Sequence, residues 1–68
     1  MAKFEIYQDT VGDFRWRFQS NHGKILAVSG EGYNNRANCE HAIILIKREA
    51  PQATIADASF SARPATAR

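Results

Sequence analysis

Gly30-Glu31-Gly32-Tyr33-Asn34-Asn35-Arg36-Ala37 is the stretch at which an alternating, strand-like sequence gives way to the only helical pattern in the chain. Glycines on both sides of an acid can take the positive φ angles that a sharp change of direction needs. Asn35 stands where its side chain can accept from the first backbone N–H groups of a helix. We therefore predict a structural corner at Gly30, Gly32 and Tyr33, followed by that helix.

The two glycines of this corner also raise the question of an anion-binding loop. A phosphate loop combines further glycines with a lysine at defined spacing, or follows a buried parallel strand. The stretch has a G-x-G spacing with no third glycine and no lysine. The sequence thus favours a structural turn over phosphate binding.

Two alternating segments before the corner predict a β-hairpin. Residues 3–8 and 14–19 both alternate apolar with polar side chains, and the residues between them are rich in turn formers. Pairing Gln8 with Phe14 gives a register that is consistent on both faces and sets Tyr7 opposite Arg15 as a cation–π pair. The core face then holds Phe4, Ile6, Phe14, Trp16 and Phe18, and the polar face holds Glu5, Tyr7, Arg15, Arg17 and Gln19.

A turn at residues 22–23 introduces a third strand. A two-residue turn there places Ile25 and Ala27 on the aromatic face, with glycine supplying a positive φ. A three-residue turn would place Leu26 and Val28 on that face instead. We favour the two-residue turn.

The helical pattern runs from Arg36 to Glu49 and ends before Pro51. Ile44 and Leu45 fall outside its apolar stripe, so the helix either has a second apolar contact or exposes these side chains, as monomers often do. The stripe that we expect to lie on the sheet consists of Cys39, Ala42, Ile43, Ile46 and Ala50.

Residues 52–57 predict a short fourth strand around Ile55. This strand has one large apolar side chain, which is little to anchor it within a single chain. The residues from 58 onward are too poor in apolar side chains to fold. We expect one domain over residues 1–57 and a disordered tail over residues 58–68.

A domain of this size buries only about 60% of its unfolded surface and needs added stabilisation. Cys39 is the only cysteine, so no internal disulfide forms, and His22 and His41 have no metal-ligand spacing with it. We therefore expect no metal and no cofactor. A partner chain is the remaining means of stabilisation.

Three features of the sequence bear on the location of the protein. The single thiol, the absence of a secretory signal and the lack of an apolar run of about 18 residues predict a soluble cytoplasmic protein without a membrane partner.

Basic and acidic residues cancel over residues 1–57, and the excess of two positive charges comes from Arg63 and Arg68. This balance argues against a nucleic-acid module, although it allows a local patch.

Several short motifs occur together over residues 3–57. They are Phe-Glu-Ile-Tyr at 4–7, Phe14-Arg15-Trp16-Arg17, Gly23-Lys24-Ile25-Leu26-Ala27, Ser29-Gly30-Glu31-Gly32-Tyr33, Ala37, Glu40, Ile43, Lys47 and Ala50-Pro51. In combination they resemble the YegP-like domain, a small bacterial and archaeal module of uncharacterised function.

This resemblance implies an α+β fold, a β-β-β-α-β unit with an antiparallel sheet and one helix packed on one face. Two such units form one continuous antiparallel sheet with exchanged C-terminal strands, so a single copy implies a homodimer. Positions 44 and 45, usually polar in the family, are apolar here; they can widen a contact between the helices of the dimer or serve another partner. We place the dimer interface at Ile44, Leu45, Thr54, Ile55 and Ala56.

These inferences favour a non-catalytic interaction or scaffold module rather than an enzyme. Cys39 lies on the core-facing stripe, where a buried small residue is expected rather than a reactive thiol. The best ligand candidate is the polar sheet face formed by Tyr7, Arg15, Arg17 and Gln19, which could hold an anion or a stacked base as a weak nucleic-acid or polyanion binder. Neutralisation of Arg17 by Glu5 favours a solvated face instead.

Overall fold

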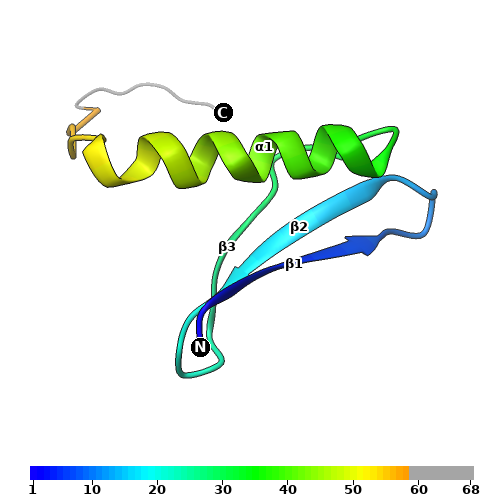
Figure 1. Ribbon diagram of the computed structural model, residues 1–68, viewed down its shortest axis with the longest axis horizontal. Coiled ribbons are helices and arrows are strands. Elements are labelled where there is room, and N and C mark those ends of the chain that lie inside the picture. The colour runs from blue at the N-terminus through cyan, green and yellow to red at the C-terminus, as the bar shows by residue number, and fades with distance from the viewer. Residues whose placement is uncertain (59–68) are drawn as a thin grey trace.

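A three-stranded sheet and one helix make up the fold, in the computed structural model that describes residues 1–58. Strands β1 (Lys3–Gln8), β2 (Phe14–Gln19) and β3 (Ile25–Val28) form an antiparallel sheet in the order β1-β2-β3. Helix α1 (Arg36–Glu49) covers one face of this sheet (Figure 1). In that view the strands approach α1 near its N-terminal end and diverge from it toward its C-terminal end. The predicted α+β class is confirmed.

The first hairpin has the predicted register along its whole length. Gln8 lies opposite Phe14, and Lys3 at the other end lies opposite Gln19. The alternating faces and the opposite charges of Glu5 and Arg17 all favour this one alignment, because a slip of one residue would exchange the two faces.

Asp9 closes the loop between β1 and β2. Its Oδ1 accepts from the backbone N–H groups of Val11 and Asp13 at 3.1 and 3.0 Å. Its own backbone N–H donates to the Asp13 carbonyl at 2.9 Å, and Gly12 takes a φ of 91°. The carboxylate thus replaces the backbone partners that these loop residues lack.

The turn before β3 is three residues long, so the prediction of a two-residue turn was wrong. The backbone N–H of Ser20 donates to the Lys24 carbonyl at 2.8 Å, and Gly23 takes a φ of 84°. The Ser20 hydroxyl accepts from the backbone N–H groups of His22 and Lys24 at 3.2 Å each. These local bonds favour the longer turn.

A β-bulge then restores part of the predicted register. Phe18 lies opposite Ala27, as expected, but Gln19 lies opposite Ile25, so Leu26 is the extra residue of the bulge. Ile25 is therefore aligned with the polar face and does not join the core, which corrects the prediction for this residue.

The corner at Gly30, Gly32 and Tyr33 is formed differently from the prediction. Neither glycine has a positive φ; within residues 1–58, that conformation occurs at Gly12 and Gly23. The direction of the chain is set by Tyr33, which exchanges two backbone hydrogen bonds of 2.8 Å with Phe14. Tyr33 thereby continues the sheet beside β2.

Helix α1 has the predicted bounds because its two ends carry the expected signals. Asn35 has an extended φ of −139°, and its side-chain oxygen accepts from the Asn38 N–H at 2.8 Å. After Glu49 the chain continues as a 3-10 turn, η1 (Ala50–Gln52), in which Pro51 occupies an early position where no N–H is needed.

The core is small for a folded domain. Only Trp16, Cys39 and Ile43 are buried hydrophobic residues among those described, and Phe4 packs edge-on against Trp16 with ring centroids 5.4 Å apart. Partly buried side chains surround this cluster: Phe4, Ile6, Phe14, Phe18, Tyr33 and Ile46. The sheet-facing position of Cys39, Ile43 and Ile46 agrees with the predicted stripe.

Residues 53–58 form no strand in this single chain, so the predicted fourth strand is absent from its own sheet. Ile55 is 99% exposed. Without an apolar neighbour for Ile55, the segment has no side-chain contact to hold it against its own sheet. The predicted tail lies outside the described residues except for residue 58.

Candidate functional site

The polar sheet face brings together the four predicted ligand residues, but its arginines already have acidic partners. The Nε of Arg15 donates to Oδ2 of Asp9 at 2.7 Å. The Nε of Arg17 donates to Oε1 of Glu5 at 2.8 Å. Neutralised in this way, the face has little charge left to attract a polyanion.

Tyr7 and Gln19 are also engaged within the face. The guanidinium carbon of Arg17 lies 4.6 Å from the centroid of the Tyr7 ring. The prediction assigned this contact to Arg15, directly opposite Tyr7; Arg15 instead reaches along the hairpin to Asp9, and the diagonal neighbour takes its place. Gln19 donates from Nε2 to the Gly23 carbonyl at 3.1 Å.

These pairs shift the acidity of two carboxyl groups. The hydrogen bond from Arg17, followed by the charges of Arg17 and Lys3, lowers the pKa of Glu5 below its ordinary value. The hydrogen bond from Arg15 lowers the pKa of Asp9, although partial desolvation opposes the change. The lowered pKa values favour the ionised form of both carboxylates, the form that pairs with Arg15 and Arg17.

A second surface is apolar and lies on β3 and on the flank of α1. All four residues of β3 are exposed, and within residues 1–58 this strand pairs on one side only. On α1, Ile44 is 51% exposed and Leu45 is 36% exposed. The apolar surface predicted outside the helix stripe is therefore present in the single chain.

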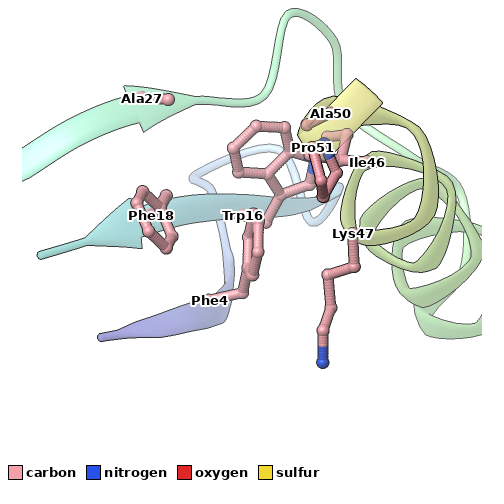
Figure 2. A pocket seen from close by; sticks show the side chains of 8 residues that line it. All are labelled: Phe4, Trp16, Phe18, Ala27, Ile46, Lys47, Ala50 and Pro51. Atoms are coloured by element: carbon pink, nitrogen blue, oxygen red, sulfur yellow. The ribbon is translucent and has the colours of Figure 1, made fainter. Parts of the chain in front are cut away.

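A groove of about 320 Å³ opens between the C-terminal end of α1 and the sheet. Figure 2 shows Trp16 and Phe4 on one side and the helix end with Ile46 and Pro51 on the other. The complete lining is Phe4, Trp16, Phe18, Ala27, Ile46, Lys47, Ala50 and Pro51. The sequence did not indicate this groove, because it results from the divergence of helix and sheet.

Two polar groups on residues that line the groove have no partner among residues 1–58. The indole N–H of Trp16 is buried and has no hydrogen-bond acceptor there. Lys47 extends from α1 at the edge of the groove in Figure 2 and forms no ion pair within the described residues. An unpaired buried donor costs about 1–3 kcal/mol, so the position of this N–H group is unfavourable in a single chain.

Cys39 and the histidines offer no constellation for covalent or metal chemistry in the described part of the chain. Cys39 is fully buried, and burial raises the pKa of its thiol. His22 and His41 are exposed, and no group of three or more potential metal-ligating side chains occurs within residues 1–58. No helix in that range has the length and apolar character to cross a bilayer.

Two residues of structural importance were missed by the sequence interpretation. Asp9 was assigned to a loop, although an acid three residues before a glycine in a hairpin loop is a usable signal. Ser29 is buried. Its backbone N–H donates to the Trp16 carbonyl at 2.9 Å, and its Oγ accepts from the backbone N–H of Trp16 at 3.3 Å. Its role has no sequence signal, because it depends on the position of Trp16.

These features define a small α+β domain, a helix on an antiparallel sheet, whose core is open at one end and whose edge strand is apolar. A family described as "Domain of unknown function (DUF1508)" matches residues 9–57, and the chain belongs to this family. The resemblance to the YegP-like domain is thus confirmed.

Relatives and a solved structure agree with this assignment. The UPF0339 protein NMB1088 of Neisseria meningitidis serogroup B is 48% identical over 44 residues, 65% of this chain and 77% of the relative. The UPF0339 protein Atu0232 of Agrobacterium fabrum is 46% identical over 57 residues, 84% and 90% of the two chains. The solution structure of a Haloferax volcanii protein is similar with a TM-score of 0.77 and 40% identity, covering 84% of this chain and 95% of that one.

Proposed function

We propose that this protein is a homodimeric, non-catalytic interaction module in which two copies share one antiparallel sheet. In this proposal the segment with Thr54, Ile55 and Ala56 leaves its own subunit and pairs with the sheet of the other. Ile44 and Leu45 contribute a contact between helices. Such an exchange is a low-cost route to a dimer, because each subunit supplies what the other lacks.

The observation that carries the proposal is the apolar surface left open by a single chain. Three hydrophobic residues are buried within residues 1–58, whereas β3, the flank of α1 and Ile55 together expose more large hydrophobic side chains than that. An apolar edge strand without a partner invites pairing with another chain. A second copy covers this surface and enlarges the core at once.

A non-catalytic role is supported by the chemistry of the described residues. The one thiol is buried with a raised pKa, and the arginines of the polar face are held by carboxylates. These pairs also weaken the alternative of a nucleic-acid or polyanion binder. A lone buried thiol suits a reducing compartment, so we place the protein in the cytoplasm.

Sedimentation of the full chain tests the proposal directly. From about 100 µM down to about 1 µM the protein should sediment with twice the chain mass of 7.6 kDa. A species with the mass of one chain at every concentration contradicts the homodimer.

A further inference from the structure

Few side chains are buried for the number of residues that the fold orders. Within residues 1–58, the buried hydrophobic residues are Trp16, Cys39 and Ile43. Folding has to offset the conformational entropy of every ordered residue, and burial of apolar surface is the main favourable term. A single chain therefore has little with which to stabilise its own fold.

Strand β3 shows this imbalance most clearly. Its backbone pairs with β2, and directly after it the backbone N–H of Ser29 donates to the Trp16 carbonyl at 2.9 Å. All four residues of β3 are nevertheless exposed, Leu26 by 61% and Val28 by 59%. Ordering β3 thus costs backbone entropy that side-chain burial in the same chain does not offset.

Helix α1 depends on an equally narrow contact. It has 14 residues, a length at which an isolated helix is marginal in water. Its two buried residues are Cys39 and Ile43, which pack with Trp16 of β2. Loss of this one cluster would remove the burial of the helix and of the sheet together, so neither layer is stable without the other.

We propose that folding and assembly are a single step in this protein, so that the surfaces of the interaction module exist only in the dimer. This inference rests on the proposed homodimer and adds its regulation. Subunits that separate also unfold, because obligate homodimers often have no stable folded monomer. The module is then available only above a threshold concentration of the chain.

Urea unfolding at several protein concentrations tests this coupling. Far-ultraviolet circular dichroism follows α1, and fluorescence follows Trp16, the only tryptophan in the chain. When unfolding also separates two chains, a rise in concentration from about 1 µM to about 100 µM should raise the urea midpoint by about 1–2 M. A midpoint that does not move with concentration overturns the coupling.

Sedimentation across the same urea transition separates this inference from the homodimer itself. We expect the mass of two chains and the circular dichroism of α1 to be lost together, with no folded species of one-chain mass. Loss of the dimer mass while the circular dichroism is still native overturns the coupling and leaves the homodimer intact. A folded species of one-chain mass at every concentration, without urea, overturns both.

A substitution outside the proposed interface gives an independent measurement. In Gly32→Ala the added Cβ would lie 2.7 Å from the Cβ of Asp13, whereas a Cβ added at Gly30 has no atom within 4 Å. If folding and assembly are coupled, a defect within each chain also weakens the dimer, and both chains carry it.

The apparent dissociation constant of Gly32→Ala should therefore rise about 20-fold or more. The matched control Gly30→Ala should change it less than about threefold. A Gly32→Ala chain that unfolds at lower urea than this control but dimerises as tightly overturns the coupling.

Discussion

Gly32 lies so close to Asp13 that a Cβ added to it would stand 2.7 Å from the Cβ of Asp13 and 2.8 Å from its Oδ2. This contact, rather than a positive φ, is why the second glycine of the corner is needed. Asp13 and Gly32 directly precede Phe14 and Tyr33, whose backbones are hydrogen-bonded to each other. Neither residue can therefore move away from the other without weakening these bonds.

The first prediction follows from this contact. Gly32→Ala should destabilise the fold by about 1–3 kcal/mol, because the methyl group would overlap the side chain of Asp13. Gly30→Ala is the matched control, since an added Cβ there has no atom within 4 Å and its φ is not positive. Urea unfolding at one fixed protein concentration measures both, and equal losses would show that the contact with Asp13 is not the cause.

The second prediction concerns acid stability. The folded pKa values of Glu5 and Asp9 lie below their ordinary values of 4.5 and 3.8, so their stabilising effect is complete above those values. It is lost as the pH falls through the lowered folded pKa values. The free energy of unfolding, measured from about pH 6 to about pH 2, should therefore decrease toward acid.

Removing one partner isolates the effect of Asp9. In Arg15→Gln the pKa of Asp9, followed by the ¹³C shift of its carboxyl carbon, should rise toward the ordinary value of 3.8. The acid-dependent loss of stability should become smaller in the same variant. An unchanged Asp9 titration would mean that the loop N–H groups of Val11 and Asp13, rather than Arg15, set this pKa.

The first hairpin and the helix could be predicted from sequence because their signals are local and redundant. Alternation, opposite charges and the aromatic face all specify the register that pairs Gln8 with Phe14. Asn35 and Pro51 mark the limits of α1 in the same direct way. Each of these features depends on residues within one or two neighbouring elements.

The features that were missed depend on contacts between distant segments. The bulge at Leu26 compensates for a turn one residue longer than predicted, and no pattern within β3 distinguishes this from a regular strand. Gly32 looks like a turn residue in sequence, whereas its role is set by Asp13. The groove exists because helix and sheet diverge, which is a property of their packing angle.

The third prediction tests the helix flank of the proposed interface. Leu45→Gln should raise the dimer dissociation constant about tenfold or more, because each dimer would place two glutamines in an apolar contact. Leu45 is 36% exposed in the single chain, so the subunit should tolerate the change. Glu31→Gln puts the same side chain at the exposed corner before α1, outside the proposed interface, and should leave the dissociation constant unchanged. A dimer equally stable in both variants would remove Leu45 from the interface.

The last prediction asks whether the arginines of the polar sheet face bind a polyanion, or whether binding depends only on the net charge of the chain. Arg15 and Arg17 are held by Asp9 and Glu5, so a polyanion gains little by contacting them. Arg15→Gln with Arg17→Gln should therefore reduce binding to labelled single-stranded DNA less than Arg63→Gln with Arg68→Gln, although both pairs remove two positive charges.

Fluorescence anisotropy at about 20 mM and about 150 mM salt measures this difference, because binding through free cations declines steeply with salt. We expect weak binding at the lower salt concentration and almost none at the higher. If the Arg15 and Arg17 variant instead loses binding that the tail variant keeps, DNA has displaced the carboxylates from their arginines. Arg15 and Arg17, with Tyr7 beneath Arg17, would then form a polyanion site, and the interaction module would have a ligand of its own.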